Sequence, residues 1–303
     1  MPSRRLGRSL GVRVVPLKAC SYNCVYCQLG RTNILTVERK EWLPSHEILG
    51  EILEVYDRLG ETIDYITFLG DGEPTLHSRI GWLIDRVKEE TGAKIAVLTN
   101  GSLLYIEEVA ESLLEADLVS PKLDATDERM FRIINRPHPS ITYEKMYEGL
   151  VEFRRKYRGF LWLEVMLVEN LNDTIPHLQL LAEKIKEIKP DNIFINTPIR
   201  PPAEEWVKPP TSDRILKAAQ ILGARRTPIT LPQAEFRLEA YPNPIEAIID
   251  ITRTHPMSID EVRKTLINYG YNPDQIIQQV LSTGQVSMRR YMDKYYLVYR
   301  SPR

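Results

Sequence analysis

Cys20-Ser-Tyr-Asn-Cys24-Val-Tyr-Cys27 contains all three cysteines of a chain of 303 residues. The spacing, three residues and then two, lets a single loop bring three thiols together. Soft sulfur ligands select zinc, copper(I) or iron–sulfur clusters. Because a fourth cysteine is missing, one coordination position stays open, and a reacting metal needs such a position for its substrate or cofactor.

The CxxxCxxC spacing resembles the signature of the radical S-adenosylmethionine (radical SAM) superfamily. The resemblance implies that Cys20, Cys24 and Cys27 bind three irons of a [4Fe-4S] cluster, and that S-adenosylmethionine chelates the fourth. It also implies that one electron from the cluster cleaves this cofactor to a 5′-deoxyadenosyl radical, which abstracts hydrogen from a substrate. The protein would position the cofactor, tune the cluster and exclude side reactions.

A structural zinc site is the alternative for the same three cysteines. Structural zinc almost always has four protein ligands, so a histidine would have to complete the set. The candidate nearest in sequence, His46, stands well away at the expected start of a helix. Disulfide pairing is disfavoured because the cysteine count is odd and nothing marks secretion. We therefore favour the cluster over zinc.

Composition limits the class of protein. Hydrophobic residues make up 43% of the chain and charged residues 27%, with a formal net charge of -1. A sizeable core is therefore expected, and no bulk basic field is available for a nucleic-acid backbone. The basic N-terminus lacks the apolar run of a signal peptide, and no apolar stretch approaches the ~20 residues that span a bilayer. We expect a soluble, cytoplasmic protein without a membrane partner.

Strand and helix patterns alternate from residue 11 to about residue 223. The runs expected to form strands are Val12–Leu17, Tyr65–Leu69, Lys94–Leu98, Leu118–Leu123, Leu161–Val168 and Asn192–Asn196. The expected helices are Glu47–Leu59, Arg79–Thr91, Tyr105–Ala116, Asp127–Asn135, Tyr143–Arg158, Ile175–Lys189 and Ser212–Leu222. Six βα units in series predict an α/β fold with a parallel sheet, either open and doubly wound or closed toward a barrel. The radical SAM resemblance implies a partial TIM-type (β/α)6 barrel.

In both architectures, ligands bind at the carboxyl ends of the strands. The second expected strand runs into Gly70-Asp71-Gly72-Glu73-Pro74, which resembles the Gly-Gly-Glu-Pro motif that binds the methionyl amino group of the cofactor. Two glycines let the backbone approach a ligand closely, and a Glu next to Pro is a rigid acceptor for a cation. Asp71 departs from the family pattern, which usually has a small residue there.

Further candidate cofactor residues stand near other strand ends. Asn100 follows the third expected strand, and Lys122 and Asp124 come at the end of the fourth. The resemblance implies that these positions bind the ribose and carboxylate of S-adenosylmethionine, and that Tyr26 packs against the adenine. Asn100 and Asp124 are also common turn residues, so ordinary loop chemistry is the alternative for each.

The segment Asn135-Arg136-Pro137-His138 ends the expected helix over 127–135. Arg136 and His138 carry the polar groups suited to meeting a substrate. A solvated helix end is the interpretation that we favour.

A different pattern follows the proline-rich stretch Tyr241–Pro244. Three capped helices and two β-like runs around a short turn, Gln285–Arg290 and Lys294–Tyr299, are typical of a winged helix. We expect a radical SAM barrel over residues 1–235, a linker over 236–245 and a winged-helix-like domain over 246–303. Residues Asn272–Met288, which include the recognition-helix position, lack Lys and Arg. A structural or protein/RNA-docking role is therefore favoured over DNA reading.

Within the superfamily, the chain looks similar to the iron–sulfur oxidoreductases grouped with the wyosine-base synthases, which remodel a guanosine of transfer RNA. Those synthases use further cysteines for a second cluster, whereas the first cluster consumes every cysteine here. We expect a single-cluster enzyme that acts on a macromolecule, either a tRNA base or a protein residue. Its electron donor would be of the reduced ferredoxin or flavodoxin type. The alternative is a zinc-stapled α/β binding protein with a nucleic-acid-reading winged helix.

Overall fold

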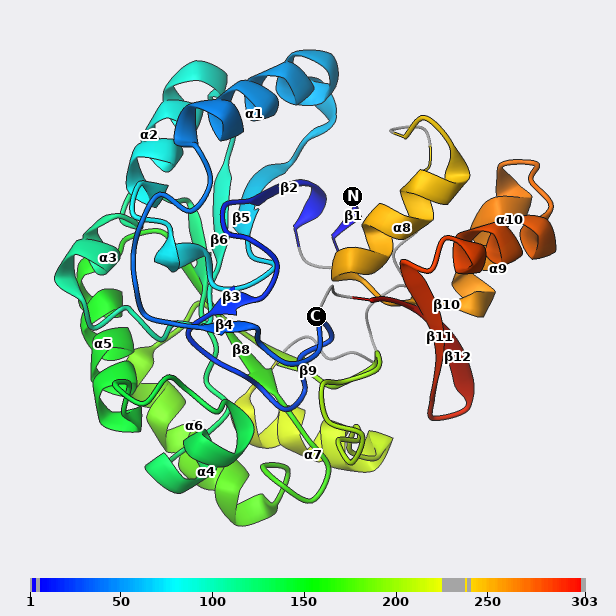
Figure 1. Cartoon of the computed structure of the whole chain (residues 1–303). Helices are drawn as coiled ribbons and strands as arrows, with labels where there is room; N and C mark the ends of the chain where they lie inside the picture. Colours follow the sequence, from blue (N-terminus) through cyan, green and yellow to red (C-terminus); the bar gives the residue numbers. More distant parts are fainter. Residues whose placement is uncertain (1, 4–5, 225–237, 239–240, 301–303) are drawn as a thin grey trace.

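A computed structural model describes residues 2–3, 6–224, 238 and 241–300 (Figure 1). Its main sheet has seven strands in the order β1-β2-β5-β6-β7-β8-β9, and the last six of these run parallel. The strands are β1 (Pro2–Ser3), β2 (Gly7–Arg13), β5 (Tyr65–Leu69), β6 (Ile95–Leu98), β7 (Leu118–Ser120), β8 (Phe160–Met166) and β9 (Asn192–Asn196). A separate short pair joins β3 (Ala19–Cys20) to β4 (Ile34–Leu35).

Helices follow the parallel strands and lie in an arc outside them (Figure 1). They are α1 (Ser45–Leu59), α2 (Ile80–Thr91), α3 (Glu107–Glu111), α4 (Glu128–Ile134), α5 (Tyr143–Lys156), α6 (Ile175–Ile188) and α7 (Ser212–Leu222), with single 3₁₀ turns at η1 (Gly60–Thr62) and η2 (Pro74–Leu76). The sheet ends at β1 on one side and at β9 on the other, so it does not close on itself. The α/β fold with six parallel strands is confirmed, and it is consistent with the expected partial barrel.

Most expected elements appear close to their predicted bounds, and the first strand is the clearest exception. It was expected over 12–17 but lies at Gly7–Arg13. The polar residue Ser9 is buried in this strand, and its hydroxyl is hydrogen-bonded to that of Thr67 on β5. A polar residue at this position made the segment resemble a loop in the sequence. Val14 and Val15 are buried but lie in the turn that leads to the cysteines.

Two other elements are shorter than expected. The strand expected over 118–123 ends at Ser120, because Pro121 cannot donate to a ladder. The helix expected over 105–116 keeps only Glu107–Glu111, and single turns continue it to Ala116.

The distribution of buried apolar and buried polar side chains indicates where a site can form. One large apolar cluster lies between the strands and the outer helices, and a smaller one of Leu6, Ala96 and Leu118 packs with Trp162. Buried polar side chains such as Glu73 and Asp124 instead lie just after the carboxyl ends of strands, and buried Asn135, which follows α4, bonds Asp124.

The C-terminal module has a core of its own. Its elements are α8 (Pro244–Thr254), β10 (Met257–Ser258), α9 (Ile259–Asn268), α10 (Pro273–Ser282), β11 (Val286–Tyr291) and β12 (Lys294–Tyr299). The strands form an antiparallel sheet in the order β10-β12-β11. Side chains of Asn243, Ser258 and Asn272 cap the three helices as the sequence predicts. The barrel end expected at 235 and four residues of the linker expected over 236–245 (236, 237, 239 and 240) lie outside the described residues.

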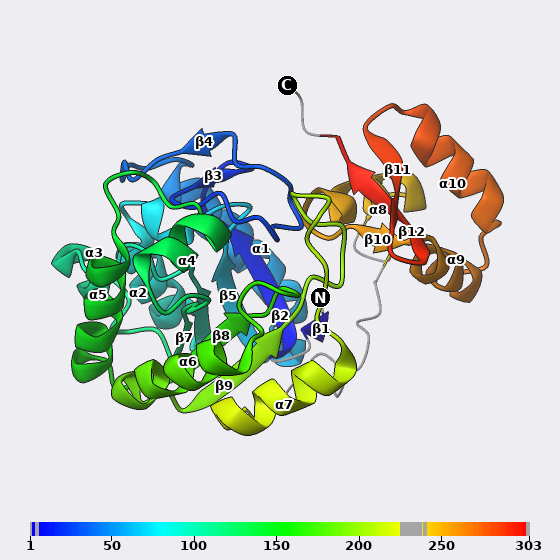
Figure 2. The same ribbon diagram turned by 90° about the horizontal axis from the view of Figure 1, so that it is seen from below.

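The module lies to one side of the barrel in both views (Figures 1 and 2). The C-terminal end of α8 meets the segment just after Cys27, where the Gln28 side-chain amide donates to the carbonyl of Thr254 at 2.7 Å. The hydroxyls of Tyr291 and Tyr296 donate to the carbonyls of Pro198 and Ile199, at 2.7 and 3.0 Å. Among the described residues, no helix combines the length and the apolar character needed to cross a membrane.

Candidate functional site

The cysteine loop is held from two sides by backbone hydrogen bonds. On one side, the amide of Lys18 donates to the carbonyl of Asp71 at 2.5 Å, and that of Glu73 donates to Ala19 at 3.0 Å. On the other side, the amide of Val25 donates to Ile134 at 2.9 Å, and a bridge joins the segment that follows α4 to Tyr22. Two segments distant in the sequence therefore fix the loop at the carboxyl ends of the strands.

Cys20, Cys24 and Cys27 are free thiols, and each is partly buried. Burial raises the pKa of Cys20 well above its usual range. Burial, and then the neighbouring Cys27, raise the pKa of Cys24 to about 12. Since a metal ligand must be a thiolate, these sulfurs need a cationic partner to lose their protons.

The donors around the sulfurs suit an anionic, sulfur-ligated group. Cys20 Sγ accepts from the backbone N–H of Tyr22 at 3.4 Å and from Asn100 Nδ2 at 3.6 Å. Cys24 Sγ accepts from Asn135 Nδ2 at 3.7 Å. Cationic Lys122 has Cys24 and Cys27 among its electrostatic neighbours. The residues present therefore fit an iron–sulfur cluster.

Within the described residues, no group of three or more His, Cys, Asp or Glu side chains is arranged to hold a single metal ion. A cluster has a different requirement, because each cysteine binds its own iron and the sulfurs stand farther apart. The three thiols are nevertheless neighbours, since Cys24 and Cys27 both act electrostatically on Cys20.

Glu73 joins the ends of two adjacent strands. Its Oε1 accepts from the hydroxyls of Thr75 and Thr99, both at 2.6 Å, and its Oε2 accepts from the backbone N–H of Asn100 at 2.7 Å. Burial raises its pKa even though these donors oppose the shift. The predicted cofactor residue is therefore placed beside Cys20, one of its electrostatic neighbours, with its carboxylate held in a fixed position.

The two glycines of the Gly70–Glu73 loop allow a close approach between two stretches of backbone. A Cβ on Gly72 would lie 1.6 Å from the carbonyl oxygen of Ala19, next to Cys20. A Cβ on Gly70 would lie 2.1 Å from the carbonyl oxygen of Gly72. Gly72 therefore admits the backbone of the cysteine loop, and Gly70 admits a tight turn within its own loop. That these glycines also let the backbone approach a ligand stays a prediction.

The side chain of Asp71 lies away from the cysteines. Its Oδ2 is 3.5 Å from Arg13 Nε, and Asp250 of α8 is among its electrostatic neighbours. Its Oδ1 is buried and has no hydrogen-bond partner among the residues that the structure describes. Burial raises the pKa of this carboxyl, and the guanidinium of Arg13 offsets only part of the effect.

Tyr26, Lys122 and Asp124 are brought together beside Cys24. The Tyr26 hydroxyl donates to Asp124 Oδ2 at 2.5 Å, and Lys122 Nζ lies 5.5 Å from the centre of the Tyr26 ring. Burial would lower the pKa of Lys122, but the carboxylates of Glu164 and Asp124 outweigh it and raise that pKa. Lys122 therefore stays protonated in the interior.

The segment after α4 contributes residues that the sequence did not single out. Asn135 is only 3% exposed, and its amide donates to Asp124 Oδ2 at 2.8 Å. Arg136 adopts a positive φ of 44° and pairs with buried Glu204 at 2.5 Å, which Arg31 also contacts. The favoured interpretation, a solvated helix end, concerned Arg136 and His138, which are both partly exposed, and it gave no role to buried Asn135. The signal that could have found it was the polar Asn-Arg-Pro-His run itself.

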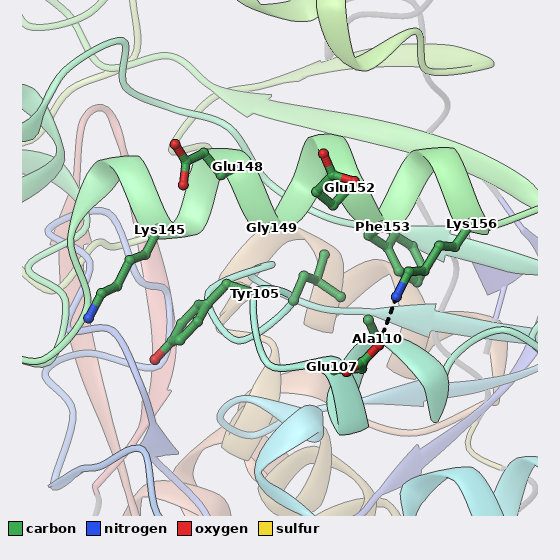
Figure 3. Close-up of a pocket in the computed structure, with 10 residues that line it drawn as sticks. Tyr105, Glu107, Ala110, Lys145, Glu148, Gly149, Glu152, Phe153 and Lys156 are labelled. Carbon is green, nitrogen blue, oxygen red and sulfur yellow. Dashed lines mark hydrogen bonds and ion pairs between the residues drawn. The ribbon is translucent and has the colours of Figure 1, made fainter.

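A pocket of about 400 Å³ lies elsewhere, on the outer face between α5 and the segment that contains α3 (Figure 3). Tyr105 and Lys145 line it, and an ion pair at 3.1 Å joins Glu107 to Lys156 across it. It is formed by the helical layer and not by the strand ends, so it is separate from the cysteine site.

Known proteins resemble this chain in sequence and in fold. The sequence pattern of the radical SAM superfamily matches residues 14–182. The UPF0026 protein MJ1312 of Methanocaldococcus jannaschii is 38% identical over 299 residues, which cover 97% of this chain and 92% of that protein. A protein of Thermotoga sp. (strain RQ2), named probable dual-specificity RNA methyltransferase RlmN, is 25% identical over 210 residues, which cover 67% of this chain and 58% of that protein.

A solved structure of TYW1 with a lysine-pyruvate adduct bound has a TM-score of 0.51 at 18% identity, and the match covers 71% of this chain and 72% of that chain. This likeness concerns the fold. The superfamily match spans more than half of the chain and includes the cysteine loop and the Gly70–Glu73 loop. The chain therefore belongs to the radical SAM superfamily and, within it, to the UPF0026 proteins, and its cofactors are a [4Fe-4S] cluster and S-adenosylmethionine.

Proposed function

We propose that this protein reductively cleaves S-adenosylmethionine to a 5′-deoxyadenosyl radical and abstracts hydrogen from a macromolecular substrate, a tRNA base or a protein residue. The observation that carries the proposal is the cysteine loop, fixed at the strand ends with N–H donors directed at Cys20 and Cys24. When bound, the cluster supplies the single electron for this cleavage. That electron would come from a donor of the reduced ferredoxin or flavodoxin type.

In this proposal, Cys20, Cys24 and Cys27 hold the cluster. Lys122, charged and beside the Tyr26 ring, is the group best suited to the carboxylate of S-adenosylmethionine. Tyr26 contributes an aromatic surface next to the cluster loop.

The remaining predicted cofactor residues would support the site and not contact the cofactor through their side chains. Glu73, Asn100 and Asp124 already have internal partners, so they support the site by fixing its loops. Gly72 lets the Gly70–Glu73 loop lie against the cysteine loop, and Gly70 allows the tight turn within the Gly70–Glu73 loop. Asp71 would take part through its backbone, since its side chain lies toward Arg13.

The C-terminal module supports a macromolecular substrate. Its three helices and its hairpin suit the proposed winged helix over 246–303, and it contacts the segment just after Cys27 through Gln28. The absence of Lys and Arg from residues Asn272–Met288 favours docking of a partner over reading of DNA. The 25% identity to a protein named as an RNA methyltransferase makes tRNA the first substrate to try. A zinc-stapled binding protein is not favoured.

The test is an anaerobic assay. The protein is reconstituted with iron and sulfide, reduced with dithionite and given S-adenosylmethionine, and 5′-deoxyadenosine is measured by mass spectrometry. We expect product from the wild type and from Arg155→Ala, a control on the exposed face of α5. Stoichiometric zinc without any 5′-deoxyadenosine would contradict the proposal.

Substitution of one cysteine separates a catalytic cluster from a structural metal. Cys24→Ala is expected to abolish cluster assembly and product formation, because a site-differentiated cluster needs all three thiolates. The barrel should remain folded, since its large core does not depend on the metal. Circular dichroism and iron analysis measure the two effects, and loss of the fold would indicate a structural metal instead.

A further inference from the structure

Two asparagine amides lie against the cysteine loop from opposite sides. Asn100 follows β6, and Asn135 follows α4. Each amide nitrogen has two hydrogens and is within hydrogen-bond distance of one cysteine sulfur. We propose that Asn100 and Asn135 are positioning residues that raise the reduction potential of the cluster through N–H···S hydrogen bonds to Cys20 and Cys24. This inference rests on the proposed function, because it requires that these two cysteines bind the cluster.

The orientation of the Asn100 amide is fixed by its neighbours. Its Oδ1 accepts from the backbone N–H of Ser102 at 2.8 Å, and a backbone N–H can only donate. Its Nδ2 must therefore point the other way, where it lies 2.9 Å from Ser21 Oγ and 3.6 Å from Cys20 Sγ. One hydrogen anchors the amide on Ser21, and the other is left for the sulfur.

Asn135 repeats the arrangement at the second cysteine. Its Nδ2 lies 2.8 Å from Asp124 Oδ2, and a carboxylate accepts hydrogen bonds, so nitrogen and not oxygen faces Asp124. The backbone N–H of Met166 holds the other oxygen of Asp124 at 2.8 Å. The second hydrogen of Asn135 is directed toward Cys24 Sγ at 3.7 Å and the Tyr26 hydroxyl at 3.4 Å.

The effect of these two donors on the reduction potential follows from the negative charge of the cluster. Reduction adds an electron to a cluster whose negative charge extends onto the cysteine sulfurs, and a donor at sulfur stabilises that added charge. Hydrogen bonds to the sulfurs are among the determinants of cluster potential. Cys27 differs from the other two, because Lys18 is among its electrostatic neighbours, whereas Lys122 is a neighbour of both Cys24 and Cys27. The two amides therefore add donors at Cys20 and Cys24 to the positive charge near Cys24 and Cys27.

The experiment measures the midpoint potential of the reconstituted protein by an EPR-monitored redox titration without substrate. Asn100→Leu and Asn135→Leu keep the approximate volume of the side chain and remove the donor. Each is expected to lower the equilibrium constant for reduction by about threefold to tenfold, and tenfold corresponds to about 59 mV for one electron. Asn268→Leu, at an exposed position of α9 in the C-terminal module, is the matched control, because it makes the same substitution without touching a cysteine.

The outcomes are distinct. Unchanged potentials in Asn100→Leu and Asn135→Leu, each with a full cluster, overturn the inference, and so does an equal shift in Asn268→Leu. If Asn135→Leu takes up no cluster, Asn135→Ala replaces it, and Asn100→Leu tests the other amide independently. Failure of the wild type itself to assemble a cluster counts against the proposed function and leaves these variants without the group that they would tune.

Discussion

Asp71 shows how one residue can depart from a family motif without facing the site. Its backbone carbonyl accepts from Lys18 at the cysteine loop, while its side chain lies toward Arg13 and α8. Its Oδ1 has no partner in the described part of the chain, and an unsatisfied buried oxygen costs about 1–3 kcal/mol. The ionised Asp71 carboxyl therefore destabilises the folded protein. The small residue that the Gly-Gly-Glu-Pro motif usually has at this position would carry no such group.

We predict that Asp71→Asn stabilises the protein at neutral pH. Burial places the folded-state pKa of Asp71 above 3.8, so the stability that this group contributes is present at low pH and is lost as pH rises through the folded pKa. The melting temperature of the variant should exceed that of the wild type by about 2–4 °C at pH 7 and match it near pH 4. Thermal unfolding by circular dichroism measures both values.

The control for this comparison is Asp57→Asn, at an exposed position on α1. It should leave the melting temperature unchanged at both pH values. A wild type more stable than Asp71→Asn at pH 7 would mean that the ion pair with Arg13 outweighs the burial of the carboxyl.

At the scale of elements, local signals set most boundaries. Gly92 and Gly223 end α2 and α7 with positive φ values of 64° and 69°, the conformation in which glycine is a common residue at helix C-termini. Gly60 also follows a helix but has a φ of -49°, because η1 continues directly from α1. A glycine therefore indicates a helix end reliably here only where no further turn follows.

Gly72 lies in the loop between β5 and η2, directly against β3. We predict that Gly72→Ala separates the Gly70–Glu73 loop from β3, because a Cβ at 1.6 Å from the Ala19 carbonyl oxygen cannot be accommodated. Cluster content should fall severalfold, and stability should fall by about 1–3 kcal/mol, the penalty for an overpacked contact. Iron and sulfide analysis and urea unfolding measure the two quantities.

The matched substitution is Gly223→Ala, far from the site. A Cβ there meets nothing within 4 Å, so only the positive φ of 69° opposes it. It should cost about 1–2 kcal/mol of stability and leave cluster content unchanged. Equal loss of cluster in both variants would show that global destabilisation, not the loop contact, controls assembly.

At the scale of the whole molecule, the C-terminal module is joined to the loop that follows β9. The hydroxyls of Tyr291 and Tyr296 bond the carbonyls of Pro198 and Ile199, and Arg200 Nε donates to the carbonyl of Pro256 at 3.1 Å. Gln28 adds a direct bond from the segment after Cys27. A shift of the module would therefore act on the segment after Cys27 and on the loop after β9 through these hydrogen bonds.

We predict that the double variant Tyr291→Phe, Tyr296→Phe loosens this junction. Each substitution removes a hydroxyl donor from a backbone carbonyl, and we expect a loss of about 1–3 kcal/mol per bond. Urea unfolding should show the loss, and hydrogen exchange at the amides of Ile199 and Arg200 should become faster. Tyr295→Phe, on the same hairpin but 52% exposed, is the control and should change neither. Unaltered exchange in the double variant would mean that the module is not held through these bonds.

Much of the fold and part of the site could be predicted from the sequence. The bounds of β5, β9 and α7 agree with the expected ranges, and the helix caps at Asn243, Ser258 and Asn272 lie where the sequence places them. The first strand was misplaced because its buried polar Ser9 is satisfied by Thr67, a partner far along the chain. The candidate residues were predicted from motifs, but their partners were not.

By itself, the sequence determined the features that depend on spacing within a few residues: the three-thiol loop, the alternation of strands and helices, and the caps. Only the tertiary structure decided which side chains meet across long separations. It placed Asn135 against Cys24, 111 residues away, turned Asp71 toward Arg13, and joined Gln28 to Thr254. The physical reason is that caps and periodicity arise from neighbours along one element, whereas contacts across strand ends arise from how separate elements pack.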